Sequence, residues 1–121
     1  LTDFGMEPKD FDRIITGDLG AVGQKLLFEL LDENYKDIKK NHMDCGMQIF
    51  DEESQDTHAG GSGCACSALM LSAVILPKLV AGEWKRVLFV PTGALLSQVS
   101  ANEGRTIPAI AHAVWLESGK E

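Results

Sequence analysis

The apolar residues of this chain change their spacing from one segment to the next. Residues 13–16 form a short β-branched run bounded by aspartate and glycine, which predicts a buried strand. After a turn at 17–20, apolar positions recur at 23, 26, 27, 30 and 31, one face of a helix over residues 20–34. We expect Asp18 to cap this helix. A strand, a tight turn and a helix are the opening of an α/β unit.

The middle of the chain is polar and irregular. Residues 35–60 show only one short strand candidate, at 47–50. A loop of this length inside a small domain usually carries function or forms an interface.

A second helix is expected from Ser62 to about Ala81. Its first turns hold only small residues, and its later part is apolar on nearly every side, so we expect it to be buried. Pro77 should weaken its last turns, and Gly82 suits its end.

Two strands are expected near the end of the chain, at 86–90 and 107–116. The first is continuously apolar, which is typical of a strand covered on both faces. The connection at 91–106 is too long for a tight hairpin and includes Leu95, Leu96 and Val99, which indicates a loop that packs on another surface. The order of elements predicts an α/β fold: a mixed sheet with helices on its faces and antiparallel final strands.

Composition narrows the possible functions. The 121 residues suffice for one domain, and 45% hydrophobic with 24% charged residues is the composition of an ordinary globular protein. A net charge of −7 and the lack of a basic stripe argue against nucleic-acid binding. The longest apolar run, 64–77, is shorter than the roughly 20 residues needed to span a bilayer, so any membrane association should be peripheral. The three cysteines are interpreted as reduced thiols, and the leucine at position 1 suggests a part of a longer chain.

Several stretches together carry a family resemblance. They are 14–20 (IITGDLG), 44–47 (DCGM), 54–64 (SQDTHAGGSGC), 87–96 (VLFVPTGALL) and 107–113 (IPAIAHA). On these residues the chain resembles the C-terminal half of the thiolase and ketoacyl-synthase superfamily, and it is most similar to the stage V sporulation protein AD family. The resemblance covers nearly the whole chain.

The resemblance implies a thiolase-like fold and a role in spore formation. Members of the family are implicated in binding dipicolinic acid and moving it into the developing spore, and they work with membrane-embedded proteins of the same operon. We therefore expect this chain to bind dipicolinic acid, free or as its calcium chelate, at the cytoplasmic face of the spore inner membrane. No cofactor is expected. A C-terminal half should also self-associate or pair with an N-terminal half.

The same resemblance implies that the catalytic residues are missing. Superfamily enzymes take a nucleophilic cysteine from the N-terminal half and, in condensing enzymes, a histidine and an asparagine that fall here at about Gly17 and Gly61. Thiolases carry a further cysteine where this chain has Val90 and Pro91. Glycine can neither transfer a proton nor stabilise an oxyanion through a side chain, so we predict a binding protein. Acyl transfer by Cys64 or Cys66, and a purely structural dimerisation role, remain as alternatives.

The predicted ligand site surrounds the glycine-rich segment. Unpaired N–H groups at a helix start attract anions, and glycine lets a ligand approach the backbone. The expected ligand-binding residues are His58, Gly61, Ser62, Gly63, Cys64 and His112. The small residues equally suit close helix packing, and the two cysteines equally suit inert packing.

For the remaining polar residues we predict burial or exposure from their place in the expected elements. His112 should be at least half buried inside the final strand, and either a core histidine or a ligand contact. His42 should be solvated. The acidic patch 51–53 should be an exposed loop, with calcium attraction as the alternative, and no metal site is expected.

Overall fold

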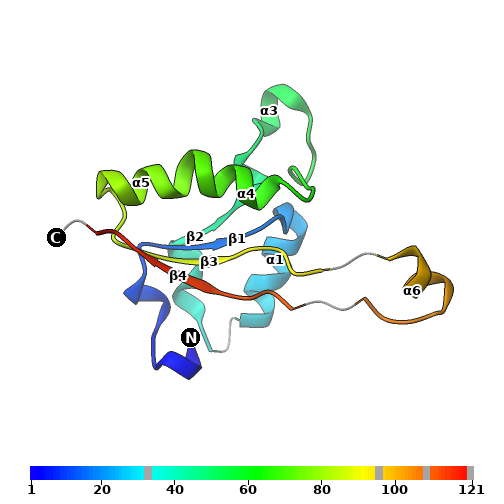
Figure 1. Ribbon diagram of the computed structural model, residues 1–121, viewed down its shortest axis with the longest axis horizontal. Coiled ribbons are helices and arrows are strands. Elements are labelled where there is room, and N and C mark those ends of the chain that lie inside the picture. The colour runs from blue at the N-terminus through cyan, green and yellow to red at the C-terminus, as the bar shows by residue number, and fades with distance from the viewer. Residues whose placement is uncertain (32–33, 95–96, 108–109, 120–121) are drawn as a thin grey trace.

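A four-stranded sheet forms the centre of the computed structural model, which describes residues 1–31, 34–94, 97–107 and 110–119 (Figure 1). The strands are β1 (Arg13–Thr16), β2 (His42–Asp44), β3 (Arg86–Val90) and β4 (Val114–Glu117), in the order β2-β1-β3-β4. β1 runs parallel to β2 and β3, whereas β4 is antiparallel to β3. This confirms the predicted α/β class, the mixed sheet and the antiparallel final pair.

Helix α1 (Gly20–Leu31) lies on one face of the sheet. Ile14 of β1 points to this side and belongs to a buried cluster with Phe11 and Ile38. Phe28 and Leu31 of α1 pack against that cluster, so the predicted apolar stripe holds the helix to the sheet. Three short 3₁₀ segments complete this layer: η1 (Thr2–Phe4), η2 (Pro8–Asp10) and η3 (Lys36–Lys40).

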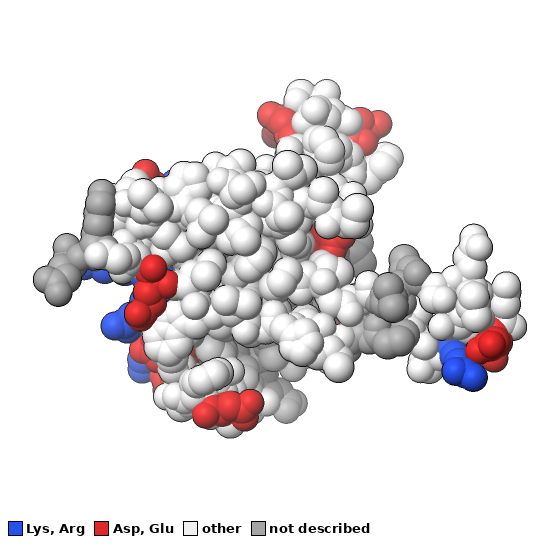
Figure 2. All heavy atoms as spheres, viewed as in Figure 1, with Lys and Arg blue, Asp and Glu red and all other residues white. Residues whose placement is uncertain are grey.

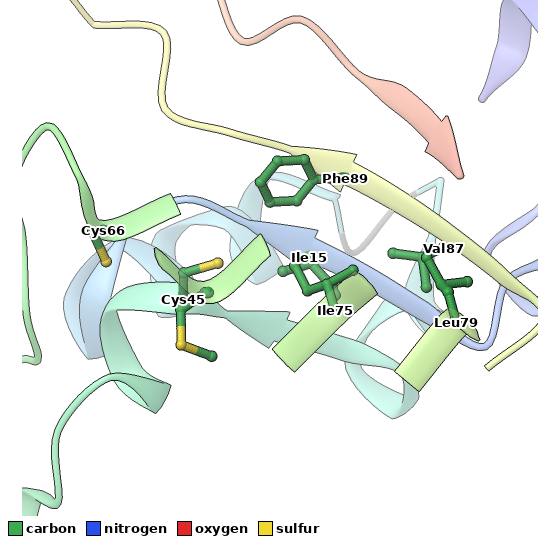
Figure 3. Close-up of a cluster of buried hydrophobic side chains, with 8 residues drawn as sticks. Ile15, Cys45, Cys66, Ile75, Leu79, Val87 and Phe89 are labelled. Atoms are coloured by element: carbon green, nitrogen blue, oxygen red, sulfur yellow. The ribbon is translucent and has the colours of Figure 1, made fainter. Parts of the chain in front are cut away.

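A longer helix lies on the opposite face and consists of α4 (Cys66–Met70), the π segment η4 (Leu71–Ile75) and α5 (Leu76–Ala81). Ile75 and Leu79 pack against Ile15, Val87 and Phe89 of the sheet (Figure 3). The widened π turn ends two residues before Pro77, which has no N–H to donate to the preceding turn. Gly82, in the left-handed region at φ 79°, ends the helix as predicted.

The prediction of a strand at 47–50 is wrong. The strand of this region is β2, and the short helices α2 (Cys45–Gln48) and α3 (Glu52–Gln55) follow it. The Gly46 N–H donates to the Gly17 carbonyl at 3.1 Å, and the Gly46 carbonyl accepts from the Gly61 N–H at 2.6 Å. Residues 45–48 are themselves helical, and the Ile49 N–H donates to the Cys45 carbonyl at 3.1 Å, so this segment does not form a strand ladder.

The second helix begins at Cys66, not at Ser62 as predicted. The last strand is also shorter than predicted, since it begins at Val114. The described residues between β3 and β4 instead form an arm that projects from the sheet and carries α6 (Gln98–Asn102) at its tip (Figure 1). Near its base the Ile110 N–H donates to the Gly93 carbonyl. Val99 on the arm is 66% exposed, so it does not pack on the sheet, and Leu95 and Leu96 lie outside the described residues.

Candidate ligand-binding cleft

An open cleft of about 730 Å³ lies beyond the carboxyl ends of β1 and β3. The neighbours of β1 are β2 on one side and β3 on the other, so the chain changes direction across the sheet at this point. Open α/β sheets bind ligands preferentially at such a place. The described lining comprises Asp18, Ser62, Gly63, Cys64, Ser67, Ala68, Leu71, Phe89, Pro91, Thr92 and Ala94.

The Asp18 carboxylate joins the three loops that form the polar end of the cleft. Its Oδ2 accepts from the Ser62 hydroxyl at 2.7 Å and from the Gly63 N–H at 3.2 Å. Its Oδ1 accepts from the Thr92 hydroxyl, and Thr92 Oγ1 in turn accepts from the Asp18 N–H at 3.1 Å. The cleft is therefore held in shape by one charged group that contacts segments 44 and 74 residues away.

These hydrogen bonds keep Asp18 ionised. Partial burial by itself raises the pKa of the Asp18 carboxyl, but the hydrogen bonds from Thr92, Ser62 and Gly63 outweigh burial and lower its pKa below the ordinary value. The described lining contains no lysine or arginine. The polar end of the cleft is thus negatively charged. The Ser62 hydroxyl and the Gly63 N–H of the glycine-rich loop already donate hydrogen bonds to Asp18.

Helix α1 is capped by Asp44 and not by Asp18, contrary to the sequence prediction. Asp44 is 1% exposed, and its two oxygens accept from the Leu19 and Gly20 N–H groups, each at 3.0 Å. Asp44 Oδ1 also accepts from the Thr16 hydroxyl at 2.6 Å. A carboxylate at the end of β2 therefore satisfies the first N–H groups of α1 and ties the β1 turn to its neighbouring strand.

His42 is partly buried and hydrogen-bonded, so the prediction that it is solvated is wrong. Its Nδ1 lies 2.9 Å from Gln24 Nε2 and its Nε2 lies 3.1 Å from Thr16 Oγ1. Because Thr16 donates its own proton to Asp44, its oxygen accepts from a proton on His42 Nε2. Burial lowers the pKa of His42 in spite of the nearby Asp44 carboxylate, in agreement with a neutral ring.

Gly17 and Gly61, where the resemblance to condensing enzymes leads us to expect a histidine and an asparagine, leave no room for side chains. A Cβ at Gly17 would meet Thr92 and would lie 2.8 Å from Ser67 Oγ. A Cβ at Gly61 would lie 2.6 Å from Ile49 Cγ2 and 2.6 Å from the Phe50 ring. Neighbouring residues therefore occupy the space that a histidine or asparagine side chain would need.

The structure brings only some of the predicted ligand-binding residues together. Ser62, Gly63 and Cys64 line the cleft, whereas Gly61 is buried beside it. His58 projects into solvent with an 86% exposed side chain, 3.7 Å from an Asp56 carboxylate oxygen. His112 is exposed and precedes β4, so the prediction that it is half buried in the last strand is wrong.

The structure also adds residues that sequence reasoning left out of the site. Asp18 and Thr92 belong to the polar end of the cleft, and Leu71 and Phe89 to its apolar wall. Their common signal in the sequence is position: Asp18 and Thr92 each come two residues after a parallel strand ends.

The cysteines differ sharply in environment. Cys64 is exposed in the cleft, whereas Cys45 and Cys66 are buried. Burial, with the nearby Cys66, Asp44 and Asp18, raises the pKa of the Cys45 thiol to about 12. Burial and the two carboxylates also raise the pKa of Cys66. Cys66 is therefore a buried, packed thiol, and its surroundings disfavour the thiolate form.

Metal-binding clusters and membrane-spanning helices are both absent from the described residues. No group of three metal-ligating side chains lies within them. Among the helices that the structure describes, none combines the length and the apolar character needed to cross a bilayer. The acidic residues 51–53 are exposed on the protruding segment that carries α3 (Figure 2).

Fold and site together define an α/β domain with an open cleft at the carboxyl edge of its parallel strands. A family model described as Stage V sporulation protein AD (SpoVAD) matches residues 1–117. The chain is also 42% identical over 115 residues to the Stage V sporulation protein AD of Bacillus subtilis (strain 168), a match that covers 95% of this chain. The chain belongs to the stage V sporulation protein AD family. It spans about a third (34%) of the length of that relative.

Proposed function

We propose that this chain is part of a non-catalytic protein that binds dipicolinic acid and helps its uptake into the developing spore. Family membership supports the link to spore formation. The closed packing around Gly17 and Gly61 supports a binding role, because the side chains of a condensing enzyme could not occupy those positions.

The cleft supports the choice of a small, flat ligand with polar groups at one side. Ala68, Leu71 and Phe89 of the lining offer apolar surface for a pyridine ring, and Thr92, hydrogen-bonded to Asp18, belongs to its polar part. The Asp18 carboxylate would repel a free dianion. Calcium, which prefers oxygen ligands, would remove this repulsion, so we propose that the calcium chelate binds more tightly than the free acid.

Calorimetry on the full-length protein tests this function. We expect heat of binding with dipicolinate plus calcium, and a weaker signal with dipicolinate plus a calcium chelator. Ala68→Phe should fill the cleft and reduce affinity at least about tenfold, which corresponds to about 1.4 kcal/mol. Ala101→Phe, at an exposed position of α6 outside the cleft lining, is the control and should bind normally. Absence of heat with both forms of the ligand would refute the proposal.

The site of action proposed here is the cytoplasmic face of the spore inner membrane, with membrane-embedded proteins of the same operon as partners. The described helices are too short or too polar to cross a bilayer, so attachment would be peripheral. Membrane fractions that contain those partners should retain the protein, and fractions that lack them should not.

Acyl transfer by Cys64 is the second candidate function, because this thiol is exposed within the cleft. The described lining includes no histidine that could act as its base. Turnover of an acyl thioester by the full-length protein, lost in Cys64→Ser, would favour the enzyme over the binding protein.

A further inference from the structure

The imidazole of His42 lies at the contact between α1 and the sheet. From its place in β2 it reaches two residues of the helix: Nδ1 lies 2.9 Å from Gln24 Nε2, and the ring packs edge-on against the Phe28 ring with centroids 5.2 Å apart. On its other side, Nε2 lies 3.1 Å from Thr16 Oγ1 at the end of β1. One side chain therefore joins α1 to both β1 and β2.

These contacts fit a neutral ring and do not fit a charged one. The neutral ring donates from Nε2 to Thr16, whose own proton goes to Asp44, and Nδ1 then accepts from the Gln24 amide. A second proton on the ring of His42 would sit on Nδ1 and face the amide nitrogen of Gln24, donor against donor. Gln24 can accept that proton only with its amide reversed, and the added charge would still lie in a partly buried place.

The charged groups around the ring come from two elements. Asp44, two residues further along the chain at the end of β2, attracts a second proton, but burial outweighs this attraction and lowers the pKa of His42. On the other side, Lys39 of η3 lies over the Phe28 ring, 5.8 Å from its centroid, and adds a positive charge. The groups of α1 and β1 that contact the imidazole are an amide, a phenyl ring and a hydroxyl. The surroundings as a whole therefore favour the neutral ring.

The position of α1 also affects the polar end of the cleft. The turn between β1 and α1 carries Asp18, whose carboxylate joins three loops. Asp44 holds the Leu19 and Gly20 N–H groups where this turn enters the helix. A helix that moves away from the sheet pulls on this turn, so the contacts of His42 with α1 help to hold Asp18 in place.

We propose that His42 is a positioning residue that releases α1 when it takes up a proton, so that the cleft loosens in mild acid. A ring released to water takes up a proton below about pH 6.5, whereas the enclosed ring does so only at lower pH. The contribution of His42 is therefore complete above about pH 6.5 and is lost as pH falls from there through the folded pKa. The proposal concerns the shape of the cleft and does not depend on its ligand.

Hydrogen exchange of the full-length protein, measured by mass spectrometry on peptides that cover residues 17–28, tests this role. After correction for the pH dependence of intrinsic exchange, the wild type should exchange at least about threefold faster at pH 5.5 than at pH 7.5. His42→Gln keeps a side-chain N–H for Thr16 but cannot become charged, so it should show no such acceleration. His58→Gln removes a histidine with an 86% exposed side chain and is the matched control, which should behave as the wild type.

Gln24→Glu separates the effect of charge from that of side-chain shape. A carboxylate at this position accepts the proton on Nδ1 and stabilises the charged ring, so the acceleration in acid should shrink or disappear. Gln48→Glu adds the same charge at an exposed position of α2 and should leave the acceleration unchanged.

Four outcomes would overturn the proposal. The first is a wild type whose corrected exchange is the same at both pH values, and the second is a His42→Gln variant that still accelerates in acid. The third is a loss of the acceleration in His58→Gln. The fourth is an equal effect of Gln24→Glu and Gln48→Glu, which would show that the partner of Nδ1 does not control the release.

Discussion

Asp18 shows how much of the cleft depends on one side chain. Its carboxylate accepts hydrogen bonds from Thr92, Ser62 and Gly63, and these contacts join three separate loops. A charged acceptor forms stronger hydrogen bonds than a neutral one. The charge of Asp18 therefore holds the shape of the cleft and also sets its electrostatic character.

Asp18→Asn should lower the free energy of unfolding at pH 7 by about 1 kcal/mol, a modest value because the group is partly exposed. The pKa of Asp18 is lowered in the folded state, so its contribution is complete above the unfolded pKa of about 4 and disappears as pH falls through the folded pKa. Urea unfolding of both proteins at pH 7 and at low pH measures the difference, which should shrink on acidification. Asp3→Asn, at an exposed position, is the control. A difference of equal size at both pH values would show that the charge is not the cause.

The cysteines allow a second prediction at this scale. At pH 8 a chromogenic disulfide reagent should modify Cys64 rapidly, whereas Cys45 and Cys66 should react only on unfolding, because burial raises the pKa of both. Cys64→Ser should remove the fast reaction and leave the slow one. Rapid labelling of Cys66 in the folded protein would contradict this description of the cleft.

At the scale of elements, a buried carboxylate joins the first helix to the sheet. Asp44 is the last residue of β2 and lies in register with Thr16 of β1. Its carboxylate caps α1 and accepts a hydrogen bond from the Thr16 hydroxyl. Three elements therefore meet at one group, and the turn at 17–20 cannot move without breaking its hydrogen bonds.

Asp44→Ala should cost about 3 kcal/mol or more of the free energy of unfolding, because it leaves one hydroxyl and two N–H groups without their acceptor. The matched control is Asp51→Ala, which removes the exposed cap of α3 and should cost about 1 kcal/mol. Chemical denaturation measures both values, and hydrogen exchange at Leu19 and Gly20 should accelerate only in the Asp44 variant. Equal costs for the two variants would contradict the joining role of Asp44.

At the scale of the whole molecule, the two helical layers each present apolar residues to solvent. Leu69, Leu76 and Val80 are exposed on one layer, and Val22, Leu26 and Leu30 on the other. On the face of the molecule shown in Figure 2 the charged side chains gather at the margins and leave a broad uncharged surface. Apolar patches of this kind mark surfaces that other protein or lipid covers.

The double variant Leu69→Gln/Val80→Gln of this 121-residue chain should bind less hydrophobic dye and remain soluble at higher concentration. Its free energy of unfolding should stay within about 0.5 kcal/mol of the wild type, because the replaced side chains lie largely outside the core. Dye fluorescence and urea unfolding provide the two measurements. Unchanged dye binding would show that this face is not the exposed apolar surface of the chain.

Local pattern predicted the elements whose residues interact mainly with near neighbours or with a uniform apolar core. The strands at 13–16 and 86–90 and the helix from residue 20 follow directly from apolar spacing, and the helix end at Gly82 follows from backbone preference. The strand predicted at 47–50 failed because Ile49 and Phe50 pack against Gly61 in a loop contact and do not join the sheet. Periodicity cannot distinguish these two uses of an apolar residue.

The same distinction separates the site residues that the sequence revealed from those that it did not. Ser62, Gly63 and Cys64 were found because a glycine-rich segment is recognisable by itself, and they do line the cleft. His58 and His112 were chosen for their chemistry, yet both face solvent. Asp18 and Thr92 were missed as partners because their contact spans 74 residues, and no local spacing encodes such a contact.

By itself, the sequence determined the α/β class, the order of the main elements and the family, because these depend on the spacing of apolar residues and on contiguous motifs. Only the tertiary structure decided that Asp44 caps α1, that Asp18 joins three loops, and that Gly17 and Gly61 have no space for a side chain. These features arise where the carboxyl ends of parallel strands meet, and there distance in space is unrelated to distance along the chain.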